Sequence, residues 1–187
     1  NPTEFVYTSQ SGEELFFNTQ GSVEKIVSTN GDELLITPEG LTSSNGVSVR
    51  FFRDDAGRVV SIQDLAGHNR SYDYSDSEDL ITYTDADAGV WRYTYDNSHK
   101  LKTITDPRGI VVQANEFDTS GRLIGVTNAD GVATAYHHDI EARREEIVGP
   151  DGTIIFFYDQ DGNVLRTITP DGNETRNSFD DFGNLTS

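Results

Sequence analysis

A short pattern recurs along most of the chain: an Asp is followed three positions later by Gly and five positions later by an aliphatic residue. The most regular copies are Asp54…Gly57…Val59, Asp118…Gly121…Leu123, Asp159…Gly162…Val164 and Asp180…Gly183…Leu185. Degenerate copies begin at Asn18, Ser75, Asp96 and Asp139, so successive copies are 36, 21, 21, 22, 21, 20 and 21 residues apart. A period this regular predicts a protein built by repeating one supersecondary unit.

Each copy of the pattern predicts a chain reversal. Asp suits the first position of a type I turn because its carboxylate accepts hydrogen bonds from backbone N–H groups, and Gly adopts the positive φ that closes the turn. A second glycine follows most copies at Gly31, Gly67, Gly109, Gly131, Gly152 and Gly172. We therefore predict two turns per repeat, with structural turn roles for Asp54, Gly57, Asp118, Gly121, Asp159, Gly162, Asp180 and Gly183.

The segments between these turns are rich in Val, Ile, Thr, Tyr and Phe, which favour β-strands. An aromatic residue stands immediately before the pattern at Phe17, Tyr74, Tyr95, Phe117, Tyr158 and Phe179. A second aromatic often stands two positions earlier, as at Tyr72 and Tyr93. Because residues two apart on a strand share a face, we expect an aromatic stripe along one side of the sheet.

Two features depart from this scheme. Residues 140–147 have the composition of a short charged helix, but they occupy the place of a turn and strand in other repeats. Propensity is a weak prior against tertiary context, so we predict a turn and strand there as well. Leu123 and Val126 differ in parity, which strict alternation does not permit on one face. Either a bulge or a sheet partly covered on both sides would explain this.

These patterns predict an all-β fold in which tandem β-hairpins form one long, strongly curved antiparallel sheet. A single hairpin is marginal in water, so each must be stabilised by its neighbours. Open twisted sheets of more than about ten strands usually curl, and this chain offers more. We divide it into residues 1–53, an N-terminal repeat with a hairpin inserted between Ile26 and Arg53, and residues 54–187, regular repeats continuous with the first part.

Charge and composition exclude several classes of function. With 14 basic and 32 acidic residues, the net charge is −18, which disfavours nucleic acids and anionic membranes as partners. The chain has no cysteine, which excludes disulfides and thiolate metal sites. Its longest apolar run, residues 154–158, is too short for membrane insertion. The chain starts and stops within the pattern, so we expect it to be part of a larger protein.

Candidate catalytic and metal-binding residues are few. His68, His99, His137 and His138 occupy turn or strand positions, and no nucleophile elbow, phosphate loop or His-Glu-x-x-His motif accompanies them. We expect no enzymatic activity. The segment from Asp159 to Asn163 resembles the start of a calcium loop, but Pro170 stands where the closing Glu belongs. We expect turn formation and no cofactor, with weak Ca²⁺ binding at acidic turns as the alternative.

The aromatic stripe has two interpretations. Tyr72 and Tyr93 could pack in cross-strand ladders, or they could join Trp91 in stacking on a sugar ligand. We favour ladders. Trp91 stands where other repeats have Arg70, Gln113 or Thr134, so it is the first candidate for ligand contact.

The segments Phe117-Asp118-Thr119-Ser120-Gly121-Arg122-Leu123 and Tyr158-Asp159-Gln160-Asp161-Gly162-Asn163-Val164 resemble the YD repeat of Rhs proteins, toxin-complex shell components, wall-associated proteins and teneurins. The resemblance implies an open arc of a β-shell, in a large secreted or cell-surface protein that encloses a toxin or presents a scaffold. In the family's toxin-bearing members, a motif of the Asp-Pro-x-Gly-Leu kind ends the array. Here Asp106-Pro107-Arg108-Gly109 is followed by Ile110 within the array, so no cleavage site or cargo is supported.

Three functional hypotheses follow. The first is a non-catalytic structural segment whose partners are the rest of the parent protein or its cargo. The second is an adhesin-like module that binds carbohydrate or protein through the aromatic face. The third, a hydrolase with scattered carboxylates, has little support because sequence cannot pair them. Open sheet edges also predict edge-to-edge self-association.

Overall fold

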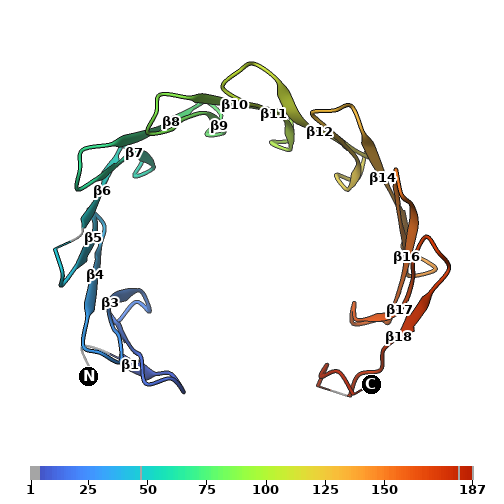
Figure 1. Ribbon diagram of the computed structural model, residues 1–187, viewed down its shortest axis with the longest axis horizontal. Coiled ribbons are helices and arrows are strands. Elements are labelled where there is room, and N and C mark those ends of the chain that lie inside the picture. The colour runs from blue at the N-terminus through green and yellow to red at the C-terminus, as the bar shows by residue number, and fades with distance from the viewer. Residues whose placement is uncertain (1–4, 47, 181, 187) are drawn as a thin grey trace. The chain divides into compact units, whose positions relative to one another are not determined.

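The computed structural model describes residues 5–46, 48–180 and 182–186, and in these residues every regular element is a β-strand. Contacts divide the chain into two compact units, Asn1–Trp91 and Arg92–Ser187. Figure 1 labels strands of both units along the ribbon. The described residues contain no helix long and apolar enough to cross a bilayer.

In the first unit, each strand pairs antiparallel with the next along the chain. The strands are β1 (Phe5–Thr8), β2 (Glu14–Phe17), β3 (Val23–Val27), β4 (Glu33–Thr37), β5 (Gly40–Ser43), β6 (Ser48–Arg53), β7 (Val59–Asp64), β8 (Asn69–Tyr74) and β9 (Leu80–Thr84). Between the Asn18 and Asp54 turns lie the four strands β3 to β6, whereas the next interval holds only β7 and β8. The long interval of the sequence pattern therefore contains an additional hairpin.

The second unit repeats the same antiparallel pairing of consecutive strands. Its strands are β10 (Val90–Tyr95), which begins at the end of the first unit, β11 (Leu101–Thr105), β12 (Val111–Phe117), β13 (Leu123–Asn128), β14 (Ala133–Asp139), β15 (Arg144–Gly149), β16 (Gly152–Tyr158), β17 (Val164–Ile168) and β18 (Glu174–Arg176). The predicted all-β class and tandem antiparallel hairpins are confirmed. Residues 140–143 form a turn and β15 follows, so the helical composition there is indeed overridden.

A bulge explains the change of parity after each regular turn. In the pair β12–β13, Glu116 lies opposite Gly125, but Phe117 lies opposite Leu123, so the register shifts between Glu116 and Phe117. Equivalent shifts occur in the pairs β2–β3, β6–β7, β8–β9, β10–β11 and β16–β17. The extra residue is Ile124, which has no partner in this register, and this accounts for the odd spacing of Leu123 and Val126.

The sheet has no interior in the usual sense. Among the described residues no hydrophobic side chain is fully buried, and the strand side chains are mostly half-buried. Among the residues that the structure describes, Asp106 is the one polar residue that is buried, with 3% of its surface exposed. Cohesion therefore comes from contacts between adjacent strands and repeats, as expected for a quasi-one-dimensional repeat protein.

Candidate functional site

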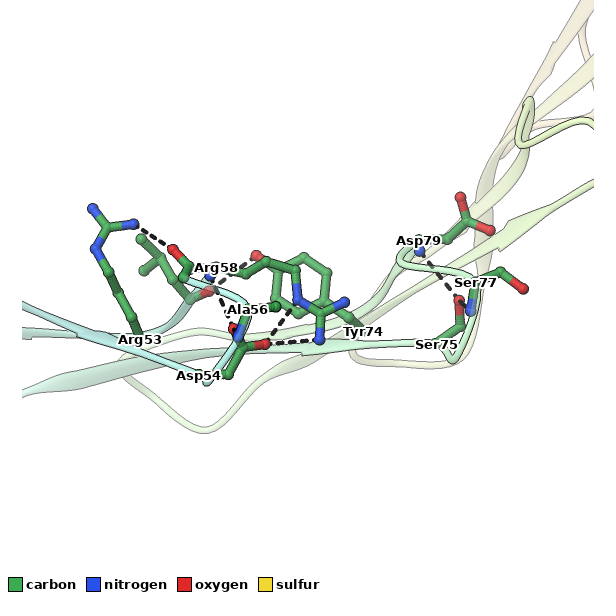
Figure 2. A network of polar contacts seen from close by, with 10 residues as sticks. Arg53, Asp54, Ala56, Arg58, Tyr74, Ser75, Ser77 and Asp79 are labelled. Atoms are coloured by element: carbon green, nitrogen blue, oxygen red, sulfur yellow. Dashed lines mark hydrogen bonds and ion pairs between the residues drawn. The ribbon is translucent and has the colours of Figure 1, made fainter.

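The Asp54 turn shows how the recurring pattern closes a hairpin. The Gly57 N–H donates to the Asp54 carbonyl oxygen (2.9 Å), and the Asp54 N–H donates to the Arg58 carbonyl oxygen (3.0 Å). The Asp54 Oδ1 atom accepts from the N–H groups of Ala56 (3.0 Å) and Arg58 (2.9 Å), as Figure 2 shows. Asp thus satisfies the backbone donors inside the turn, while Gly57 takes a φ of 82°.

The other predicted turn residues are placed in the same way. Asp118, Asp159 and Asp180 each accept through Oδ1 from the N–H groups two and four positions ahead. The second turn of many repeats uses the same backbone bonds, closed by Gly31, Gly67, Gly109, Gly131 and Gly172. The hairpin between β15 and β16 differs, because Gly149 pairs directly with Gly152 and only Pro150 and Asp151 form the loop.

Neighbouring groups lower the pKa of several turn carboxyls, among them Asp54 and Asp118. The pKa of Asp118 lies below its ordinary value because the Arg122 N–H donates to it, and the Arg122 side chain adds a hydrogen bond and a positive charge; partial burial acts in the opposite direction. At Asp54 partial burial is the largest single effect and would raise the pKa, but the bonds and charge of Arg58 together lower it. These carboxylates are engaged in turn structure, which makes them poor candidates for proton transfer.

Four turns of the described residues lack the glycine and carry another residue in the left-handed backbone region. Glu78 has a φ of 68°, Ala88 of 64°, His99 of 60° and Arg143 of 49°. Each donates its N–H to the first residue of its turn, as Gly57 does. Residues with a Cβ adopt this left-handed region at a cost, so these turns hold strained backbone.

The side chain of Arg58 links two repeats. Its guanidinium bonds Asp54 of its own turn, with Nε and one terminal nitrogen each 2.7 Å from Oδ2, and its central carbon lies 4.6 Å from the centroid of the Tyr74 ring (Figure 2). The Tyr74 hydroxyl donates to the Val59 carbonyl oxygen at 2.9 Å. We call the set of turn Asp, cation four positions later and aromatic of the next repeat a latch.

A second latch lies in the other unit. The Lys100 ammonium is 3.1 Å from Asp96 Oδ2 and 5.7 Å from the centroid of the Phe117 ring. The aromatics and the turn acids were predicted from the sequence, but the latch was not. The signal was present as the basic residue four positions after Asp54, Asp96 and Asp118.

A cluster of ionisable groups crosses β14, β15 and β16. His138 Nδ1 lies 3.1 Å from Glu145 Oε1, and His138 Nε2 lies 2.7 Å from the Leu123 carbonyl oxygen. The Tyr158 hydroxyl donates to Glu145 Oε2 at 2.9 Å. Burial, followed by the bond to Glu145 and its charge, raises the pKa of Tyr158 to about 12. His138 stands in the place of Tyr74 and, like it, bonds a carbonyl of the preceding repeat, so the geometry indicates a structural link.

The residues predicted to contact a ligand are half-buried. Tyr72 stacks on Tyr83 of the adjacent strand, with ring centroids 5.3 Å apart and an interplanar angle of 26°. Trp91 and Tyr93 lie on β10 and are also half-buried, on either side of the boundary between the units. The Tyr72 geometry is that of a cross-strand ladder.

The remaining histidines do not converge on a site. His68 Nδ1 lies 2.9 Å from Asp64 Oδ2 within one turn, His99 takes the left-handed position of another turn, and His137 is exposed. In the part of the chain that the structure describes, no three His, Asp or Glu side chains are grouped as metal ligands would be. The Asp159 carboxylate, at the start of the segment that resembles a calcium loop, accepts hydrogen bonds from its own turn.

Tandem hairpins, closed by Asp-centred turns and joined through aromatic side chains, define a β-hairpin repeat protein. Residues 93–185 match the family model described as Teneurin YD-shell, and residues 72–111 match the one described as RHS Repeat. Residues 72–185 therefore belong to the YD/Rhs repeat family, as the sequence resemblance predicted.

Similar proteins are much longer than this chain. Double-stranded DNA deaminase toxin A of Burkholderia cenocepacia (strain H111) is 30% identical over 146 residues, which are 78% of this chain and 10% of that protein. The Tc holotoxin pore of Photorhabdus luminescens has a TM-score of 0.59 at 14% identity, covering 99% of this chain and 13% of the other. A crystal structure of TcdB2-TccC3 has a TM-score of 0.53 at 15% identity, and the match covers 99% of this chain and 13% of the other. At this identity the structures establish the fold alone.

Proposed function

We propose that this chain is a non-catalytic structural segment of a larger secreted or cell-surface protein, in which its repeats build part of a β-shell that encloses or presents another domain. The observation that carries the proposal is the latch. Arg58 and Lys100 each bind an acid of their own turn and an aromatic ring of the next repeat. Side chains of the repeating pattern are thus used to connect hairpins.

The engagement of the acidic groups supports a non-catalytic role. The turn carboxylates accept backbone hydrogen bonds, and Glu145 is held between His138 and Tyr158. A catalytic carboxylate must instead face a site where substrate can reach it. The matched residues cover a tenth of the deaminase toxin, so that protein's activity is no evidence of activity here.

The partners we propose are the remainder of the parent protein and its cargo, with edge-to-edge self-association of the isolated chain. The net charge of −18 argues against nucleic acid, and the longest apolar run, residues 154–158, is too short for membrane insertion. Strand β1 pairs with β2 and strand β18 pairs with β17, so the other edge of each carries backbone groups that another strand could pair with.

Deleting one repeat tests this role. Residues 118–138 form a complete period, so their removal from the parent protein keeps the phase of the remaining turns. If these repeats form part of the shell wall, the deletion should expose the enclosed segment to protease. The control variant Asp118→Asn should leave that segment protected. Unchanged protection and assembly after the deletion would contradict the proposal.

A further inference from the structure

A groove of about 720 Å³ separates two consecutive turns of the second unit, those that start at Asp159 and Asp180. Its walls include Asp161, Leu165, Phe179 and Phe182. Leu165 is 38% exposed and Phe182 is 90% exposed. The groove therefore combines carboxylates with uncovered apolar and aromatic surface.

This groove lies where a latch is missing. Asn163 occupies the position of Arg58 and Lys100, and its side-chain amide donates to Asp159 Oδ2 at 2.9 Å, as Arg58 does to Asp54. The turn is thus intact, but Asn is too short to reach the next repeat. Within the described residues, no cation lies over the ring of Phe179, the counterpart of Tyr74.

An equivalent groove that does have the cation is much smaller. Between the turns at Asp118 and Asp139 the volume is about 310 Å³, and Arg122 is part of its wall. Arg122 Nε lies 2.8 Å from Asp118 Oδ2, in the same pairing as Arg58 with Asp54. At the position of Arg122, the wider groove has the short side chain of Asn163.

The charge around the open groove favours a cation. Asp159, Asp161 and Asp180 face a single positive lining residue, Arg143. The chain as a whole carries −18, which attracts basic polypeptides and repels acidic ones. A guanidinium or ammonium group entering the groove would meet both the carboxylates and an aromatic ring, as Arg58 does within the chain.

We propose that this groove binds an Arg or Lys side chain of an extended basic segment from a partner polypeptide, which completes the missing latch. The ligand is recognised by its positive charge and by stacking on Phe179. The inference goes beyond the structural role proposed above and does not depend on it, because it concerns a surface of the isolated chain.

Titration of the isotope-labelled chain with a short, N-acetylated peptide of alternating Gly and Arg tests the site by NMR. Amide shifts should concentrate in residues 159–163 and in Phe179, Asp180, Phe182 and Gly183, and a peptide of alternating Gly and Glu should produce none. Shifts spread evenly over the acidic turns, or equal binding of the Glu peptide, would overturn the proposal.

A long basic side chain introduced at position 163 should block the groove, and this gives a direct test of the site. Asn163→Arg should weaken peptide binding by at least about fivefold, because the new side chain would occupy the latch position itself. Ser22→Arg is the matched control: it adds the same charge four positions after Asn18, in the other unit, and should leave binding unchanged. An equal loss of peptide affinity in both variants would indicate nonspecific electrostatic attraction and would contradict the proposal.

A third variant guards against misfolding of Asn163→Arg. Phe179→Leu keeps an apolar residue opposite Leu185 but removes the aromatic face. It should also weaken binding by several-fold while retaining the wild-type circular dichroism spectrum. Wild-type affinity of a folded Phe179→Leu chain would refute the stacking part of the proposal, whatever the behaviour of Asn163→Arg.

Discussion

The guanidinium carbon of Arg58 lies 4.6 Å from the centroid of the Tyr74 ring, one repeat further along the chain. Arg58 is simultaneously paired with Asp54, both side chains being partly shielded from solvent. A partly exposed ion pair and a cation–π contact are each modest, but together they couple neighbouring repeats. The latch is therefore a means by which one hairpin stabilises the next.

Removal of the latch should lower stability measurably. Arg58→Ala should reduce the free energy of unfolding by roughly 1 kcal/mol, and a double-mutant cycle with Tyr74→Leu should give a coupling of about 0.5–1 kcal/mol. Urea denaturation followed by circular dichroism measures both. Arg50→Ala, at an exposed position, is the control and should change stability by less than about 0.5 kcal/mol. A coupling of zero would show that Arg58 and Tyr74 lie in contact without stabilising the fold.

The strained turns predict a stabilising substitution. Glu78 is exposed and has a φ of 68°, so Glu78→Gly should raise the free energy of unfolding by about 1 kcal/mol through relief of left-handed strain. Glu78→Gln separates this from loss of charge and should have little effect. The reverse change, Gly57→Ala, should cost about 1 kcal/mol, since a Cβ there would meet nothing within 4 Å and only the backbone is strained. In thermal melts, Glu78→Gly should therefore raise the melting temperature and Gly57→Ala should lower it.

Gly40 should tolerate no side chain. A Cβ at this position would lie 2.0 Å from the Val49 carbonyl oxygen, so β5 and β6 would have to separate. Gly46→Ala is the matched control, because Gly46 also has a positive φ but no heavy atom within 4 Å. Gly40→Ala should be less stable than Gly46→Ala by about 2 kcal/mol or more in urea titrations. Equal stability of the two variants would argue against this packing of the inserted hairpin.

Acid should destabilise the fold within a defined window. The pKa values of eight turn carboxyls lie below the ordinary Asp value of 3.8: those of Asp54, Asp64, Asp96, Asp106, Asp118, Asp159, Asp171 and Asp180. Lowered pKa values contribute stability above the unfolded-state pKa, and that stability is lost as the pH falls through the folded-state pKa. The free energy of unfolding should therefore decline below about pH 4.

Asp118→Asn checks the origin of this decline. The amide oxygen can still accept the turn hydrogen bonds, as it does at Asn128, but the group no longer titrates. The variant should be slightly less stable than wild type at neutral pH and should lose less stability on acidification, in urea titrations at constant salt. A steeper loss than in the wild type would contradict the assignment.

The variant Trp91→Ala distinguishes the structural hypothesis from the carbohydrate-binding hypothesis. Because Trp91 is half-buried on β10, Trp91→Ala should lower the melting temperature by several degrees, about what a loss of 1 kcal/mol causes. On a glycan array we expect the wild type to retain no glycan. Retention by the wild type and loss in Trp91→Ala, with the fold intact, would instead favour the binding module.

The turns could be predicted because their causes are local. Asp54 and Gly57 form hydrogen bonds to each other and to residues at most four positions away, so the residue types and their spacing are sufficient. The strands followed from composition between turns, and the odd spacing of Leu123 and Val126 pointed to a bulge that the pairing of Phe117 with Leu123 now shows.

The links between repeats could not be read in this way. The contact of Arg58 with Tyr74, and the grouping of His138, Glu145 and Tyr158, depend on which strands pair and in which register. The width of the groove beside Asn163 likewise depends on how far one turn lies from the next. Sequence alone determined where this backbone reverses, because that is decided within a few bonds; only the tertiary structure decided which side chains of successive hairpins meet, because register and bulge set the distances between them.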